Sequence, residues 1–234
     1  MKPTLIAHRG ASHAAPENTI TAFERALVEG AGGLELDIRL SADGEPIVFH
    51  DADLDRLTTL RGPIAQVPWS TLAKTRVGQG DATIPHLADL LALARPGLVL
   101  NVELKPIAQP RRLVDAARPY LERLAAQSEL VLSSFDPRIL ALFSATPLTA
   151  PHRLALLFED LTALSALRFL PAVDLHPAAS LLTAETFAAW SVSSRRFRAW
   201  TVDDPNEARR LLRLDPRIDL ITNRPGPLLA ELTP

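Results

Sequence analysis

The chain has 234 residues and a mass of 25.5 kDa, which is close to the usual size of one α/β barrel. It contains no cysteine, which excludes disulfide scaffolds, thiol catalysis and cysteine-based zinc or iron–sulfur sites. Its 25 Lys and Arg residues nearly balance 27 Asp and Glu residues, so no overall positive field attracts nucleic acid. We therefore expect one domain over residues 1–234 and no nucleic-acid partner.

The sequence contains no candidate membrane segment. No uncharged apolar run approaches the ~20 residues that a transmembrane helix needs. The apolar stretch before His8 and Arg9 is too short for the core of a signal peptide. The expected location is the cytoplasm, by default, and the oligomeric state stays open.

Short apolar runs alternate with amphipathic segments along the whole chain. The runs predict strands at Leu5–Ala7, Gly33–Leu40, Ile47–His50, Val99–Lys105, Val131–Ser134, Leu154–Phe158, Ala172–Leu175, Arg198–Val202 and Leu220–Thr222. Helical spacing follows Ile20, Leu87, Leu113, Ile139 and Leu161, and helix-start signals occur at Pro16-Glu17 and at Asp204-Pro205. This alternation predicts an α/β fold with a parallel sheet.

The side chains that share one face of two predicted strands favour a closed barrel over an open sheet. Because side chains alternate along a strand, Glu35 and Asp37 share one face, as do Asn101, Glu103 and Lys105. Strands of an open, doubly wound sheet are apolar on both faces, whereas barrel strands can carry polar groups at the mouth. The sequence therefore predicts a TIM (β/α)8 barrel.

The number of predicted strands exceeds eight by one. The segment from Ser41 to Gly44 has no room for a helix, so either one helix is missing or one strand forms a hairpin at the rim. The least regular stretch, residues 51–84, is predicted to be a short excursion over the barrel mouth.

Polar side chains gather at corresponding ends of the first four predicted strands, where barrel active sites lie. They are His8, Arg9, Glu35, Asp37, His50, Glu103 and Lys105. Each alone has a structural interpretation, such as a hydrogen-bonded histidine or a buried salt bridge. Together, three carboxylates face one Lys and one Arg, and the excess negative charge favours a bound divalent cation. Oxygen ligands without thiolates suit Mg²⁺, Ca²⁺ or Mn²⁺, with zinc a weaker match.

The same cluster suggests the reaction. A hard cation beside Arg9 and Lys105 suits an anionic oxygen substrate such as a phosphate ester. His8 and His50 can supply the acid and the base for phosphoester cleavage near neutral pH. No glycine-rich nucleotide loop of known pattern is present.

Several motifs in this order resemble those of the glycerophosphodiester phosphodiesterase family. The motifs are His8-Arg9-Gly10, Pro16-Glu17-Asn18-Thr19, Glu35-Leu36-Asp37, His50-Asp51, Glu103-Leu104-Lys105 and Thr222-Asn223-Arg224-Pro225. The chain is most similar to the small cytoplasmic bacterial type, which has no large insertion domain. The resemblance implies metal-dependent hydrolysis of glycerophosphodiesters, small soluble substrates, to sn-glycerol 3-phosphate and an alcohol.

The resemblance also implies a fold and a set of roles. The barrel should have an irregular or missing helix near its second and third strands. The implied metal ligands are Glu35, Asp37 and Glu103, with Mg²⁺ or Ca²⁺ as the usual ion. The implied catalytic residues are His8 and His50, with Arg9 and Lys105 on the phosphate.

Other residues are assigned less directly. Glu17 is expected in the first turn of a helix, where it orients the catalytic strand ends. For Trp200, contact with the substrate and packing in the core are both open, and the same holds for His176. Asn223 replaces an Asp of the family pattern, which weakens the site modestly if that Asp contacts a catalytic group.

Two alternative functions use the same barrel. A phospholipase acting on intact phospholipids would need an apolar rim, for which Trp69 is the one clear candidate. A non-catalytic barrel that binds phosphodiesters would be expected to lack a catalytic or ligand residue, and none is missing.

Overall fold

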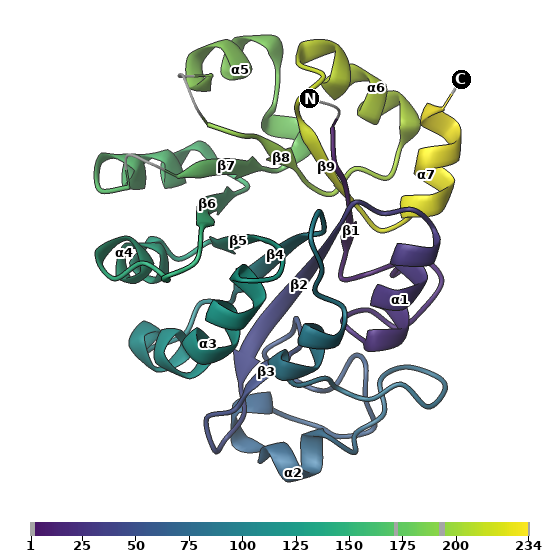
Figure 1. The fold of residues 1–234 in the computed structure, drawn as a ribbon, viewed down its shortest axis with the longest axis vertical. Helices are drawn as coiled ribbons and strands as arrows, with labels where there is room; N and C mark the ends of the chain where they lie inside the picture. The colour runs from purple at the N-terminus through teal and green to yellow at the C-terminus, as the bar shows by residue number, and fades with distance from the viewer. Residues whose placement is uncertain (1–2, 171–172, 192–194, 234) are drawn as a thin grey trace.

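Eight parallel strands form a nearly closed barrel in the computed structural model, which describes residues 3–170, 173–191 and 195–233. The strand order is β7-β6-β5-β4-β2-β1-β9-β8. The bridges Leu175–Phe197 and Ala178–Trp200 join β7 to β8 and bring the two ends of the sheet together. Figure 1 shows the helices around the outside of the strands. The predicted barrel is confirmed.

The elements follow the alternation read from the sequence. In chain order they are β1 Leu5–His8, α1 Ile20–Val28, β2 Gly33–Leu40, β3 Pro46–Val48, η1 Ile64–Gln66, α2 Trp69–Leu72, η2 Leu87–Ala92, β4 Val99–Leu104, α3 Pro110–Ala125, β5 Glu129–Ser134, α4 Pro137–Ala145, β6 His152–Phe158, η3 Leu161–Arg168, β7 Asp174–Pro177, η4 Ala179–Leu181, α5 Ala184–Trp190, β8 Arg198–Ala199, α6 Pro205–Leu214, β9 Asp219–Thr222 and α7 Pro225–Leu232. Among these helices, none has the length and apolar character needed to cross a membrane.

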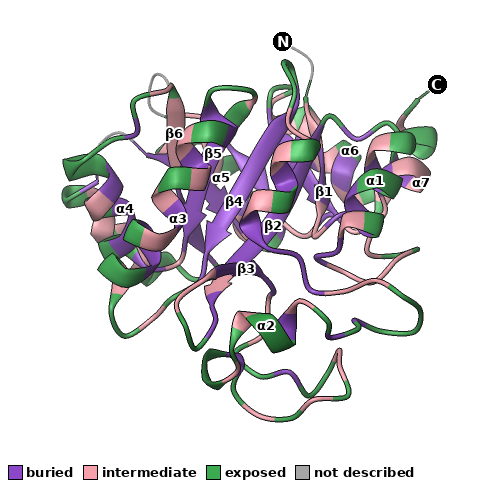
Figure 2. Ribbon diagram, turned by 60° about the horizontal axis from the view of Figure 1, so that its bottom comes forward, coloured by how far each residue is buried: buried purple, intermediate pink, exposed green. Residues whose placement is uncertain are grey.

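The ninth strand is a hairpin at the rim. β3 pairs antiparallel with β2, with Ile38 opposite Val48, and takes no place in the parallel barrel. Only the short helices η1, α2 and η2 lie between β3 and β4, so the irregular helix expected near the second and third barrel strands is confirmed. Figure 2 shows this region beyond the ends of β2 and β4. Its apolar side chains form a cluster of their own, made of Ile47, Phe49, Leu54, Ile64, Leu72, Val77 and Ile84.

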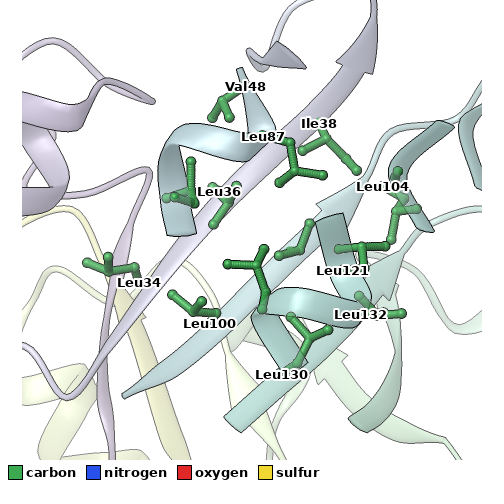
Figure 3. Packing of buried hydrophobic residues seen from close by; sticks show 14 of the residues in the cluster. Leu34, Leu36, Ile38, Val48, Leu87, Leu100, Leu104, Leu121, Leu130 and Leu132 are labelled. Carbon is green, nitrogen blue, oxygen red and sulfur yellow. The ribbon is translucent and has the colours of Figure 1, made fainter. Parts of the chain in front are cut away.

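The outer faces of the strands bind the helices through leucine-rich packing. Leu34, Leu36 and Ile38 of β2 are fully buried, and Figure 3 shows them beside the leucines of β4 and β5 and Leu121 of α3. Burying one such side chain stabilises the fold by about 1.5–3 kcal/mol. The helices therefore hold the polar residues of β2 and β4 toward the barrel interior.

Two predicted boundaries differ from the structure by three residues or more. Pro16-Glu17 does not open a helix, because α1 begins at Ile20 and the Thr19 side chain caps it by accepting from Ala22 N. Glu17 consequently lies in the turn before α1. The predicted strand Arg198–Val202 ends as regular strand at Ala199. Ala172, predicted to start a strand, lies outside the described residues.

The end of the barrel where the strands begin contains an ion-pair cluster around a buried arginine. Arg198 of β8 is 0% exposed, and its guanidinium lies 3.1 Å from Asp219 Oδ2 and 3.7 Å from an oxygen of Asp174 and of Glu129. These acids begin β9, β7 and β5, so one cation links four strands. The polar site described next occupies the opposite end.

Candidate active site

Strand register places the predicted catalytic residues side by side. His8 at the end of β1 is the partner of Glu35 on β2, and Asp37 is the partner of Glu103 on β4. Lys105 follows the last residue of β4, and its backbone NH donates to Ile38 O. Three neighbouring strands thus present these side chains at the carboxyl end of the barrel.

The turn after β1 has an unusual backbone. Arg9 has φ +57°, a left-handed conformation that costs a non-glycine residue about 1 kcal/mol. In this conformation its NH donates to Glu35 Oε2 at 2.9 Å. Gly10 follows with φ +81°, and a Cβ there would lie 2.6 Å from the carbonyl carbon of Ala22. The turn therefore requires glycine at this position and fixes Arg9 against Glu35.

The carboxylate cluster is bound by two cations and one amide. Lys105 Nζ lies 2.8 Å from Asp37 Oδ1 and 2.6 Å from Glu103 Oε1. Arg9 Nε lies 3.3 Å from Asp37 Oδ2, which also accepts from Asn18 Nδ2 at 2.7 Å. Asp37 is thus held from three sides, with a side chain that is only 1% exposed.

Burial and mutual repulsion oppose full ionisation of this carboxylate cluster. Burial opposes ionisation of Asp37, but Lys105 and Arg9 hold its pKa well below the usual range. Burial and the charge of Asp37 raise the pKa of Glu103 to about 7. Burial, with the charges of Asp37 and Glu103, raises the pKa of Glu35 well above its usual value. If all three carboxylates were ionised, they would exceed the two cations Arg9 and Lys105 by one negative charge.

This donor set fits a divalent metal. One oxygen from each of Glu35, Asp37 and Glu103 lies within 4.8 Å of the others, and all three residues are buried. A cation among them would supply the missing positive charge, and carboxylate oxygens are ligands that hard cations prefer. These residues could hold a metal ion.

His8 is oriented by an amide that is itself held by an acid. His8 Nδ1 lies 2.7 Å from Asn223 Oδ1, and Asn223 Nδ2 donates to Asp203 Oδ2 at 2.6 Å. Because Asp203 accepts from the amide nitrogen, the amide oxygen must face His8, which places a proton on Nδ1. Burial and the Arg9 charge lower the pKa of His8 to about 4, although the Asn223 hydrogen bond opposes this. His8 is neutral at neutral pH.

His50 has a charged partner instead. Its Nδ1 lies 2.7 Å from Asp51 Oδ1, and Arg56 holds the other oxygen of Asp51 at 2.7 Å. Burial lowers the pKa of His50 from its usual value, while Asp37 and the Asp51 hydrogen bond oppose the shift. Arg56 also binds Glu17 at 2.7 Å, and Glu17 binds Arg9 at 2.8 Å. Glu17 thereby links the surroundings of both histidines.

A cavity of about 230 Å³ opens among these residues. Its lining consists of His8, Arg9, Glu35, His50, Asn101, Glu103, Lys105, Phe135, Leu157, Glu159, Trp200, Thr201 and Ile221. Asp37 and Glu17 are not in this lining and contact it from behind, through Lys105 and Arg9. Trp200 does line the cavity, and its ring meets Phe135 edge-on at 5.5 Å.

His176 lies outside this cavity. It is 0% exposed on β7, and neither ring nitrogen has a hydrogen-bond partner among the described residues. Burial, with the charges of Arg198 and Arg153, holds its pKa well below the usual range.

This burial predicts a pH effect on stability. The unfolded His176 takes up a proton below its ordinary pKa of about 6.5, whereas the folded one does not, so stability falls as the pH falls. Between pH 7.5 and 5.5, His176→Leu is expected to lose about 1 kcal/mol less unfolding free energy than the wild type. Urea unfolding at the two pH values measures the difference. An equal loss in both proteins would contradict the assignment.

Sequence analysis missed the partners that orient the two histidines and Asp37. Asn18 and Asp51 were part of the quoted motifs, but no role was given to them. Asn223 was noted only as a departure from a pattern, and Asp203 was not singled out. No local signal links Asp203 to His8, because the contact runs through a third residue on another loop.

The chain belongs to the glycerophosphoryl diester phosphodiesterase family, whose model matches residues 8–226. It is 31% identical over 224 residues to a glycerophosphodiester phosphodiesterase of Bacillus altitudinis, a match that covers 90% of each protein. It is 30% identical to a protein of the same name from Caldanaerobacter subterraneus, covering 98% of this chain and 97% of the relative.

Solved structures agree with these relatives. An Oleispira antarctica phosphodiesterase in complex with the product sn-glycerol-3-phosphate superimposes with a TM-score of 0.89 at 25% identity, covering 99% of this chain and 97% of the other. A glycerophosphodiester phosphodiesterase from Thermotoga maritima superimposes with a TM-score of 0.79 at 25% identity, covering 98% of each chain. The chain is therefore a glycerophosphodiester phosphodiesterase by family and by fold.

Proposed function

We propose that this enzyme hydrolyses glycerophosphodiesters to sn-glycerol 3-phosphate and an alcohol, by acid–base catalysis with His8 and His50. The observation that carries the proposal is the pocket, in which both histidines, Arg9 and Lys105 surround a buried carboxylate cluster. Family membership and the product complex of the Oleispira antarctica phosphodiesterase support the same reaction.

The different hydrogen-bond partners of the two histidines support a role as base for His8 and as acid for His50. Asn223 accepts the Nδ1 proton of His8, so the free Nε2 lone pair can take a proton from the attacking hydroxyl. Asp51 can stabilise the imidazolium of His50, which gives its proton to the departing alkoxide. Over the whole reaction one P–O ester bond breaks, the oxygen of water ends on phosphorus, and the alcohol leaves protonated.

The charged residues position the phosphate and stabilise its developing charge. Arg9 and Lys105 line the same pocket as both histidines, where their charges would contact the phosphate group of a bound diester. Glu35, Asp37 and Glu103 would hold the metal, with Mg²⁺ or Ca²⁺ favoured and Mn²⁺ also suited to the oxygen ligands. When bound, the ion supplies a Lewis acid for the phosphate oxygens. Glu17 holds Arg9 in place from behind.

The pocket favours a small substrate over an intact phospholipid. Its volume of about 230 Å³ is below the ~300–1,000 Å³ of typical sites for drug-sized ligands. Trp69, the aromatic residue named for an apolar rim, does not line the pocket and packs against His86 at 5.3 Å.

Metal removal tests the proposal. Purified enzyme is expected to release glycerol 3-phosphate from glycerophosphodiesters and to lose this activity in EDTA, with recovery on adding Mg²⁺ or Ca²⁺. An enzyme-coupled assay for glycerol 3-phosphate measures the release, and phospholipid vesicles serve as the comparison substrate. Full activity after stringent chelation would show that the three carboxylates are structural. Faster turnover of vesicles would favour the phospholipase function.

A further inference from the structure

The two walls of the pocket differ in chemistry. β1, β2 and β4 supply one wall, which carries His8, Arg9, Glu35, Glu103 and Lys105. Residues near the carboxyl ends of β5, β6 and β8 supply the opposite wall, and most of them are apolar: Phe135, Leu157 and Trp200. A phosphodiester has two alcohol groups on one phosphate, so a pocket with two unlike walls can distinguish them.

The apolar wall carries one carboxylate, Glu159. This residue directly follows β6, which stands four strands from β1 in either direction around the barrel. Glu159 therefore lies across the mouth from His8 and Arg9. It is exposed, and its carboxylate has no ion pair or hydrogen bond with any residue in the described part of the chain.

This placement argues against a role for Glu159 on the phosphate. A carboxylate repels a phosphodiester anion, whereas the opposite wall provides Arg9 and Lys105 for it. The catalytic pair of histidines also lies on the side of β1 and β3, away from β6. Glu159 is therefore positioned to meet whichever alcohol group points away from the catalytic wall.

Two aromatic residues, Phe135 and Trp200, line the same wall of the pocket as Glu159. Phe135 and Trp200 meet edge-on at 5.5 Å, and Trp200 Nε1 donates to His176 O at 2.7 Å, which fixes the indole. Aromatic faces attract alkylammonium groups, and a carboxylate adds a Coulombic attraction that water screens only partly at a pocket mouth.

We propose that Glu159, Phe135 and Trp200 form a subsite for the leaving alcohol and select one that carries a positively charged ammonium group. The inference rests on the proposed function and assigns its substrate class. Substrates with an ammonium alcohol gain the contact with Glu159, whereas those with a neutral polyol do not.

The test compares two diesters that share the glycerol phosphate half. Glycerophosphocholine carries a cationic alcohol and glycerophosphoglycerol a neutral one, so the ratio of their kcat/KM values isolates the subsite. Wild-type enzyme is expected to favour glycerophosphocholine. Glu159→Gln is expected to reduce the ratio about 5-fold, mainly through KM for the cationic substrate, and Glu159→Lys to reduce it further. Glu24→Gln, an exposed change on α1, is the matched control and should keep the wild-type ratio.

Ionic strength provides a second measurement. Added salt screens an exposed carboxylate, so it should lower the wild-type ratio and leave the ratio of Glu159→Gln nearly constant. Hydrolysis of both diesters with a ratio that Glu159→Gln and Glu159→Lys do not change would overturn the subsite and leave the proposed function standing. Failure of the wild type to hydrolyse either diester would overturn the proposed function itself.

Discussion

Replacing His8 with alanine is expected to lower kcat for glycerophosphodiester hydrolysis by about 100-fold or more, and His50→Ala by a similar factor. Each variant removes one of the two groups that we propose as proton carriers. Asn223 orients His8 and Asp51 orients His50, so we expect neither histidine to replace the other in proton transfer. Steady-state release of glycerol 3-phosphate at saturating metal measures the loss.

A histidine outside the pocket provides the control. His152 begins β6 and contacts the backbone carbonyl of Ala150, away from the cavity lining. His152→Ala should keep the wild-type kcat. Turnover near the wild-type rate in either His8→Ala or His50→Ala would remove that residue from the mechanism. Circular dichroism of each variant shows whether the fold is kept.

The pKa of His8 gives this result a pH dependence. Lowering the pH protonates the base and abolishes its function, but burial and Arg9 place the pKa of His8 at about 4. With metal saturating, the loss of activity that is due to His8 is expected only as the pH approaches that value. A profile of kcat/KM against pH measures it.

Replacing Arg198 with methionine is expected to lower the unfolding free energy by about 3–5 kcal/mol. The substitution removes a guanidinium that is 0% exposed, and it leaves the buried carboxylate of Asp219 without its partner at 3.1 Å. Burial raises the pKa of Asp219 and Arg198 opposes the shift, so loss of the guanidinium would raise this pKa further. Urea unfolding at pH 7 measures the change.

The neighbouring arginine is a matched control. Arg196 has a side chain that is 35% exposed and forms an ion pair with Glu129 at 2.9 Å. Arg196→Met should cost about 1 kcal/mol or less, because water already solvates both partners. A loss in Arg198→Met no larger than in Arg196→Met would show that the buried cluster contributes little to stability.

Local periodicity allowed the barrel and much of its site to be predicted. Alternation in β2 and β4 depends only on backbone geometry, so the inward position of Glu35 and Glu103 followed directly from their spacing. The antiparallel pairing of β3 depends on tertiary contacts, and the sequence left two explanations for the extra strand. The structure identifies the hairpin.

Other features had local signals that longer-range contacts overrode. Pro16-Glu17 is a helix-start pattern, but Asn18 has φ +57° and its side chain donates to Asp37. The helix α1 therefore begins only at Ile20. The amide of Asn223 and the acid behind it come from segments almost as far from His8 in sequence as this chain allows. Such contacts form only after the barrel closes, so no periodic pattern in the sequence predicts them.

Isolated bridges join β7 to β8. The neighbouring strand pairs form regular parallel ladders, with two residue pairs between β8 and β9 and four between β6 and β7. Short pairings open at lower free energy than long ones, so amide protons at this junction should exchange with solvent before those of β2 and β4. Trp200 belongs to one of these bridges and also to the apolar wall of the pocket. Local opening of the barrel is thus expected first beside the alcohol subsite, before the strands that carry the catalytic residues open.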